Sequence, residues 1–177
     1  MRTAAVALRR AAMAHVSDAL AAVYTKHRDT RDLDLFWHAA TELGRRPREV
    51  ASIDLVADTV PALKEPREFF LEGVAILVDT EREILVNKLC TLLARSELRD
   101  LVDVRTLLEA GGDLEGSLAL APQKDAGFSP LTLAWVLRGL PITSLGLGSG
   151  RPAAEVSSLE RFRDEFVRKI AGLAKPG

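Results

Sequence analysis

The chain has 177 residues, of which 47% are hydrophobic, and its 24 basic and 25 acidic side chains leave a formal net charge of −1. A chain of this length and apolar content is sufficient for one hydrophobic core, or for two small lobes that share an interface. The near-neutral charge excludes the global basic field that is typical of many nucleic-acid binders. The single cysteine, Cys90, excludes an internal disulfide and a cysteine-based zinc site, which suits a reducing cytoplasm.

The first segment is rich in alanine, and we predict an amphipathic helix over residues 3–24. Arg9, Arg10 and Asp18 interrupt its apolar residues, so it lacks the apolar stretch of a secretion signal. Nothing in the chain approaches the ~20 consecutive apolar residues of a membrane-spanning helix. We therefore expect a cytoplasmic protein without a membrane segment.

Two acidic strands and a hairpin are predicted next. Every second residue is apolar over 32–37 and again over 52–58, which is the period of a strand. Between them, a helix interrupted by glycine and proline is expected at 39–50. The sequence "REFFLEGVAILVDT" indicates a hairpin that turns at Glu72-Gly73, with residues 75–78 as its second strand.

From residue 81 onward the apolar period becomes helical. We predict helices at 81–95, 97–110, 114–124, 129–140 and 158–175, the last capped by Ser157 or Ser158, with a glycine-rich linker "SLGLGSGRP" before it. The fold class is therefore α+β, with a small mixed-sheet lobe over residues 1–80 and a helical lobe over residues 81–177.

The acidic strands carry the first candidate site. Residues two apart on a strand share a face, so Asp32 and Asp34 project side by side, and Asp54 joins them if the second strand pairs beside the first. Carboxylates that converge in this way suit Mg²⁺ and two-metal phosphoryl or nucleotidyl transfer. The alternative is a solvent-facing strand whose acids only keep it soluble.

Lys88 is the second candidate, because it lies within or beside the apolar stripe of its predicted helix. A lysine there either extends to the surface or reaches a buried partner. On the next predicted helix Arg99, Asp103 and Thr106 lie along one line, with Asp100 beside it. Lys88 could therefore pair with Asp103 and meet phosphates, or the pair could be a structural ion pair between helices.

Four segments together resemble a known family. In chain order they are "TRDLDLFW", "IDLVAD", "EILVNKLCTLLARSELRDLVDVRTLLEAGGDLE" and "KDAGFSPLTLAWVLRGLP", and they are similar to the AbiEii/MenT-type nucleotidyltransferase toxins of type IV and related toxin–antitoxin systems. The resemblance covers most of residues 16–175, and the D-x-D strand is shared with the wider DNA polymerase β-like superfamily. It implies that the mixed-sheet lobe is a nucleotidyltransferase lobe.

The resemblance also implies residue roles and an activity. Metal binding falls to Asp32, Asp34 and Asp54, and nucleotide binding to Lys88, Arg99 and Asp103; the implied catalytic residues are Asp32, Asp34, Lys88 and Asp103. The implied reaction is the Mg²⁺-dependent transfer of NMP from an NTP to an RNA acceptor such as the 3′ end of tRNA, which blocks translation. A separately encoded antitoxin would restrain the toxin.

Two features separate this sequence from the family pattern. Relatives carry a Gly-Gly or Gly-Ser pair before the acidic strand, where backbone amides cradle a triphosphate, whereas "HVSDALAAVY" contains no glycine. Only the short stretch "RRPREVAS" precedes the second acidic strand, so the chain looks internally shortened. These features favour an alternative, a catalytically inactive homologue that binds a partner or RNA. A Mg²⁺-dependent phosphohydrolase would use the same acids with water as the acceptor.

Overall fold

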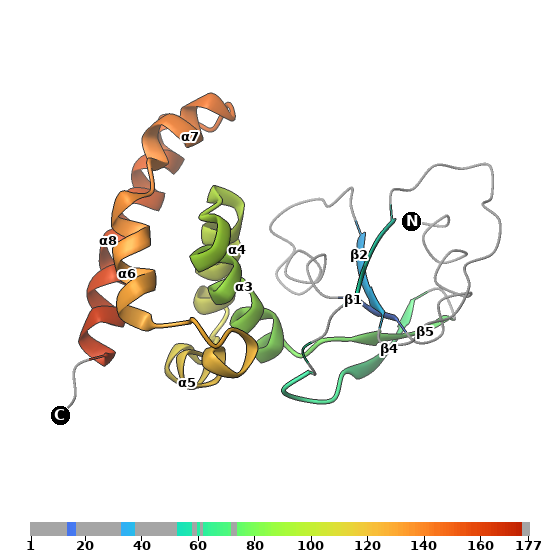
Figure 1. Cartoon of the computed structure of the whole chain (residues 1–177). Helices are drawn as coiled ribbons and strands as arrows, with labels where there is room; N and C mark the ends of the chain where they lie inside the picture. Colours follow the sequence, from blue (N-terminus) through green and yellow to red (C-terminus); the bar gives the residue numbers. More distant parts are fainter. Residues whose placement is uncertain are drawn as a thin grey trace. The chain divides into compact units, whose positions relative to one another are not determined.

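The computed structural model describes residues 14–16, 33–37, 53–57, 60, 62–71 and 74–174. Packing divides the chain into two compact units, Met1–Ile84 and Leu85–Gly177 (Figure 1). The assignment of residues 1–80 and 81–177 to two domains stays a prediction.

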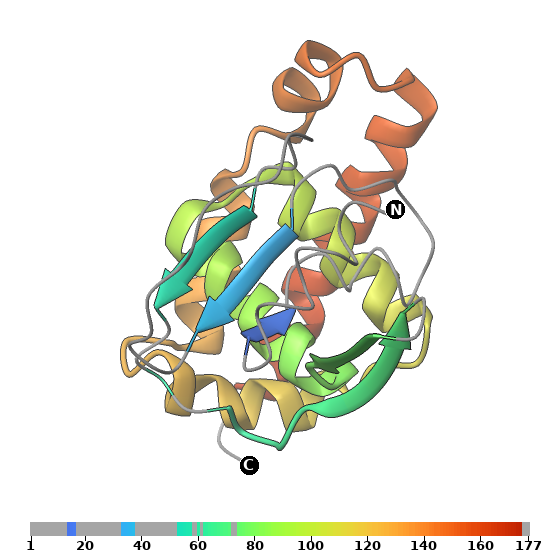
Figure 2. The same ribbon diagram turned by 90° about the vertical axis from the view of Figure 1, so that its right-hand side faces the viewer.

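The described strands of the first unit form one five-stranded sheet in the order β3-β2-β1-β5-β4. The strands are β1 (Ala14–Val16), β2 (Leu33–Trp37), β3 (Ile53–Ala57), β4 (Arg67–Leu71) and β5 (Val74–Val78). The β2–β3 and β1–β5 pairs are parallel, whereas the β1–β2 and β4–β5 pairs are antiparallel. Because it contains both kinds of pair, the sheet is mixed, as the sequence predicts. Figure 2 shows β3 (teal), β2 (light blue) and β1 (dark blue) as neighbours.

Both acidic strands and the hairpin are confirmed. β2 and β3 lie inside the segments where apolar residues alternate, a period that matches a strand because successive residues of a strand face opposite sides of the sheet. In the hairpin, Leu71 of β4 pairs with Val74 of β5 on either side of the predicted turn.

The helix predicted over residues 3–24 is wrong at Ala14–Val16, which form β1. This strand pairs with Leu35 of β2 on one side and with Val78 of β5 on the other, both through Val16. Pairing on two edges outweighs the helix propensity of an alanine-rich segment. The other residues of that predicted helix, and the helix predicted at 39–50, lie outside the described residues.

The first helix after the sheet is α3 (Glu81–Arg95), with the bounds that the sequence predicts. Its start is fixed by the Thr80 hydroxyl, which accepts a hydrogen bond of 3.2 Å from the backbone N–H of Glu83. The carboxylate of Glu83 in turn accepts from the backbone N–H of Leu63 at 3.0 Å. Thr80 and Glu83 are both buried, so the Thr80 hydroxyl takes the place of a water molecule as the partner of a backbone N–H in the first turn of α3.

Three further helices follow, close to their predicted bounds: α4 (Leu98–Glu109), α5 (Leu114–Lys124) and α6 (Pro130–Gly139). Beyond the end of α4, Gly111 has φ of 98°, a conformation that glycine adopts without strain. The N-cap of α5 is Asp113, whose side chain accepts from the backbone N–H of Gly116 at 3.0 Å.

Two sequence predictions near the carboxyl end are wrong. The segment expected to be a linker contains most of α7 (Ile142–Gly148), and α8 (Ala153–Leu173) begins before the expected caps, with Pro152 at its N-cap. Packing explains the difference, because α7 and α8 approach closely where Gly146 meets Val156, and both residues are buried. Ile142 of α7 is buried as well, so the helix is stabilised by tertiary contacts despite its glycines.

Replacement of Gly146 by alanine is expected to lower the free energy of unfolding by about 1–3 kcal/mol. An added Cβ would lie 2.6 Å from a methyl carbon of Val156, whose branched side chain has little freedom to move away. The matched control is Gly148→Ala, because a Cβ there meets nothing within 4 Å. We expect this control to be neutral or slightly stabilising in urea denaturation, and equal stability of the two variants would contradict the packing described for α7.

Among the described helices, no single one is long and apolar enough to cross a membrane. The pair α6 and α7, bent by 60° at the break between them, meets the same length and composition criteria when counted together.

Candidate active site

The two acidic strands are neighbours in the sheet. β2 and β3 pair in parallel, and Asp34 and Asp54 are register partners. Positions that pair in register share a face of a sheet, so two carboxylate-bearing positions lie side by side there. Carboxylate oxygens are the donors that Mg²⁺ prefers, and the donor chemistry therefore fits that ion.

The remaining predicted metal ligand, Asp32, lies outside the described residues. Within the part of the chain that the structure describes, no group of three or more His, Cys, Asp or Glu side chains is arranged to hold a metal ion. The metal set of Asp32, Asp34 and Asp54 stays a prediction.

Lys88 of α3 is buried, with only 1% of its side chain exposed. Ile84 and Leu85 one turn before it, the adjacent Leu89 and Leu92 one turn after it are also buried. A charged ammonium group in such surroundings is costly unless it is paired. The sequence prediction that this lysine lies in the apolar stripe is confirmed.

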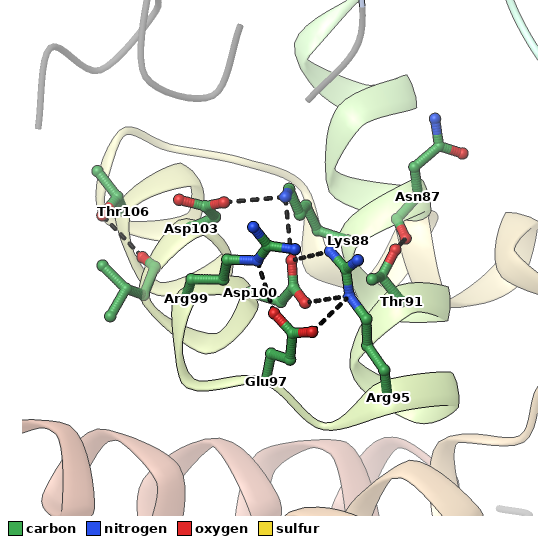
Figure 3. A network of polar contacts seen from close by, with 10 residues as sticks. Asn87, Lys88, Thr91, Arg95, Glu97, Arg99, Asp100, Asp103 and Thr106 are labelled. Carbon is green, nitrogen blue, oxygen red and sulfur yellow. Dashed lines mark hydrogen bonds and ion pairs between the residues drawn. The ribbon is translucent and has the colours of Figure 1, made fainter. Parts of the chain in front are cut away.

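Two carboxylates of α4 meet the Lys88 ammonium. Its Nζ donates to Oδ1 of Asp100 at 3.0 Å and lies 2.9 Å from Oδ2 of Asp103 (Figure 3). Both aspartates are 0% exposed, and their spacing of three residues places them on one face of α4. The expected Lys88–Asp103 pair is therefore present, and Asp100 is a second partner.

Arg95 in the last turn of α3 completes this group. Its Nε donates to Oδ2 of Asp100 at 3.0 Å, and its Nη2 donates to Oδ1 of the same carboxylate at 3.2 Å. A two-bond contact of this kind matches the planar guanidinium to the carboxylate. Lys88, Arg95, Asp100 and Asp103 thus form a cluster of two cations and two anions, which we call the ion cluster (Figure 3).

Sequence reasoning missed Arg95. The signal was present, because Arg95 lies seven residues after Lys88, and two turns of a helix return to the same face. Its side chain is 38% exposed, and an exposed arginine at a helix end is usually read as a solvated residue.

Arg99 and Thr106 do not join the described contacts of Lys88. The Arg99 side chain is 54% exposed and its Nε lies 2.6 Å from Oε2 of Glu97. The hydroxyl of Thr106 donates to the backbone oxygen of Val102 at 2.8 Å, within its own helix. Among the three residues that were predicted to lie along one line of α4, Asp103 is the one with a described contact to Lys88. The nucleotide-binding role of Arg99 stays a prediction.

Cys90 lies two residues after Lys88 on α3, and its thiol is 3.7 Å from the backbone oxygen of Ala121. Burial, and secondly the charge of Asp125, raise the pKa of this thiol to about 11. The thiolate is the reactive form of cysteine, so Cys90 is a poor nucleophile at neutral pH.

Alkylation of native Cys90 by iodoacetamide at pH 8 is expected to be about 100-fold slower than that of the urea-unfolded chain, because a rise of about two pKa units lowers the thiolate fraction to that extent. The rate should rise steeply between pH 9 and 11, since the thiolate fraction increases tenfold per pH unit below the pKa. Mass spectrometry of the modified chain measures both rates. Equal rates in the native and unfolded chains at pH 8 would contradict this account of the thiol.

The family model described as nucleotidyl transferase AbiEii toxin, type IV TA system, matches residues 44–169. The chain belongs to this family. The AbiEii match includes Asp54, Lys88 and Asp103 and begins after Asp32 and Asp34. Comparison with curated proteins and with solved structures gives no match.

The AbiEii membership confirms the resemblance, with the last three of the four segments inside the match, and it places the chain among nucleotidyltransferase toxins of type IV toxin–antitoxin systems. The ion cluster of α3 and α4 lies wholly inside the matched residues.

Proposed function

We propose that this AbiEii-family chain is a Mg²⁺-dependent toxin that transfers NMP from an NTP to an RNA acceptor such as the 3′ end of tRNA. The observation that carries the proposal is the register pairing of Asp34 with Asp54 on adjacent parallel strands in a chain of a nucleotidyltransferase family. An acceptor and substrates of this kind put the reaction in the cytoplasm, where an antitoxin of the same system would restrain it.

The proposed reaction is one substitution at phosphorus. A hydroxyl oxygen at the RNA 3′ end attacks the α-phosphorus of the NTP, and a new phosphorus–oxygen bond forms. The bond from the α-phosphorus to the oxygen that bridges to the β-phosphate breaks, pyrophosphate leaves, and the hydroxyl proton passes to solvent. Asp32, Asp34 and Asp54 would hold Mg²⁺, which when bound supplies positive charge to the attacking oxygen and the leaving pyrophosphate.

Lys88 and Asp103 would act on the nucleotide side. A lysine charge held by a fixed carboxylate in a buried setting acts strongly on nearby phosphate, because little water screens it. The exposed guanidinium of Arg99 is the third candidate for nucleotide contact. The competing interpretation, an ion pair that only joins α3 to α4, is supported by the 1% exposure of Lys88.

The test is incubation of the purified chain with each of the four α-³²P-labelled NTPs, Mg²⁺ and total tRNA. The Asp32→Ala/Asp34→Ala variant is compared with Asp164→Ala/Glu165→Ala, which removes two adjacent exposed acids from α8. We expect one NTP to label RNA with the wild type and the α8 variant, and no label with the Asp32/Asp34 variant. That result would support the transferase and name its nucleotide.

Absence of label with every NTP, from wild-type protein shown to be folded, would favour the second candidate function. This is a catalytically inactive homologue that binds RNA or a protein partner, and the absence of glycine from residues 15–24 favours it. A gel-shift titration with tRNA in the absence of NTP would then measure RNA binding directly.

A further inference from the structure

The outer face of α6 carries a solvent-exposed tryptophan. Trp135 is 74% exposed, the highest value among the large apolar side chains of the described residues, and Leu131 one turn before it is 55% exposed. On the other side of α6, where the helix packs beside α8 (Figure 1), Leu133 and Leu137 are buried. Tryptophan is highly buried on average and is enriched where proteins bind partners, so an indole left this exposed is a candidate contact residue.

The charge beside this indole is positive. Arg138, one turn after Trp135 on the same face, is exposed and has no hydrogen bond or ion pair within the part of the chain that the structure describes. Residues 126–154 contain two arginines and no aspartate or glutamate, and the second arginine, Arg151, is paired with Glu155. A second copy of this face would bring like charges together, so an anionic partner is favoured.

The size of the apolar patch distinguishes between anionic partners. A buried tryptophan contributes at most about 250 Å², whereas a stable protein interface takes roughly 800 Å² from each partner. Leu131 and Trp135 together fall well short of that area. On α7, the exposed Leu145 and Leu147 are two residues apart and point in different directions, so they do not continue one apolar stripe.

We propose that Trp135 and Arg138 form a docking surface for single-stranded RNA, with an unpaired base stacked on the indole and a neighbouring phosphate on the guanidinium. The choice of RNA rests on the proposed function, whose acceptor is the end of an RNA. The two residues bind the acceptor and take no part in the transfer step. Their loss should therefore raise KM for RNA and leave kcat and KM for the NTP unchanged.

The direct test measures binding of a fluorescein-labelled single-stranded RNA of about 12 nucleotides, within the usual size range of single-strand sites, by fluorescence anisotropy without NTP. Trp135→Leu should weaken binding about 5–100-fold, as expected for the loss of one stacked base, with an unchanged salt dependence. Trp135→Phe keeps an aromatic ring and should stay within about threefold of wild type. Arg138→Gln should weaken binding and lower the slope of log affinity against log salt by about 0.7, because one phosphate contact is lost.

Arg161→Gln is the matched control for the loss of positive charge, at an exposed arginine of α8. Arg161 lies two residues before Arg163, which donates to the backbone oxygen of Leu140 at 3.1 Å, so Arg161 points to the other side of α8. The control should keep the affinity and the salt dependence of wild type. The substituted side chains are all exposed, except for their helix backbone contacts, so the variants should fold as wild type does.

Equal RNA affinity of wild type, Trp135→Leu and Arg138→Gln would overturn this inference alone. A loss with Arg138→Gln but not with Trp135→Leu would overturn it as well, because the contact would then depend on charge without stacking. No binding of the RNA by wild type would overturn the docking surface and favour a protein partner for this face. A wild-type chain that binds the RNA through Trp135 and transfers no label would support the docking surface and overturn the proposed transferase.

Discussion

Replacement of Lys88 by methionine is expected to lower the free energy of unfolding by about 3–5 kcal/mol, the range found when one partner of a buried ion pair is removed. Methionine keeps most of the side-chain length but removes the ammonium that contacts both fully buried carboxylates, Asp100 and Asp103. Urea denaturation followed by circular dichroism measures the change. The exposed Lys169 of α8 provides the control, and Lys169→Met should stay within about 0.5 kcal/mol of wild type.

The double variant Lys88→Met/Asp103→Asn tests the charge argument more sharply. It leaves Arg95 paired with Asp100 and makes the other two positions neutral, so most of the lost stability should return. A double variant as unstable as Lys88→Met would contradict the argument, as would a Lys88→Met chain within about 1 kcal/mol of wild type.

The same double variant separates the two interpretations of Lys88. A stable chain that transfers no label would support a role at the nucleotide, because the fold no longer needs the ion pair. A stable chain with wild-type transfer would show that Lys88 and Asp103 only join α3 to α4.

Asp54→Asn is expected to lower label transfer by at least about 100-fold, because metal-borne charge stabilises the transition state by several kcal/mol and each 1.36 kcal/mol is a factor of ten. Asp54 is the predicted metal ligand that lies inside the family match and pairs in register with Asp34. The loss should be partly relieved at higher Mg²⁺ concentration if it reflects weaker metal binding.

Stability provides the second measurement for this variant. Without Mg²⁺, Asp54→Asn should be as stable as wild type or more stable, because one of several mutually repelling carboxylates has become neutral. Glu68→Gln, at an exposed acid of β4, is the matched strand control and should retain full transfer. Wild-type transfer by Asp54→Asn at low Mg²⁺ would remove Asp54 from the metal set.

The sequence predicts those helices and strands whose apolar residues recur at a regular spacing within the segment itself. The alternation at Leu33–Trp37 and Ile53–Ala57 gave both acidic strands, and the helical period gave α3 with its bounds. The burial of Lys88 followed from its place in that period, and Asp103 followed from the next helix.

The missed features depend on contacts between distant residues. Ala14–Val16 are a strand because β2 and β5 pair with them on both sides, which an alanine-rich sequence does not reveal. The glycines of α7 suggested a linker, whereas Gly146 is needed for close packing on Val156. Arg95 was missed because the carboxylate that it contacts, Asp100, lies on another helix.

The most direct test of nucleotidyl transfer compares two labelled forms of the NTP that the chain uses, one with ³²P at the α-phosphate and one at the γ-phosphate. Transfer of NMP to RNA predicts label on RNA from the α-form alone, with label from the γ-form released as pyrophosphate. Label on RNA from the γ-form, or release of γ-label as inorganic phosphate without any labelling of RNA, would contradict the account and indicate phosphoryl transfer or hydrolysis instead.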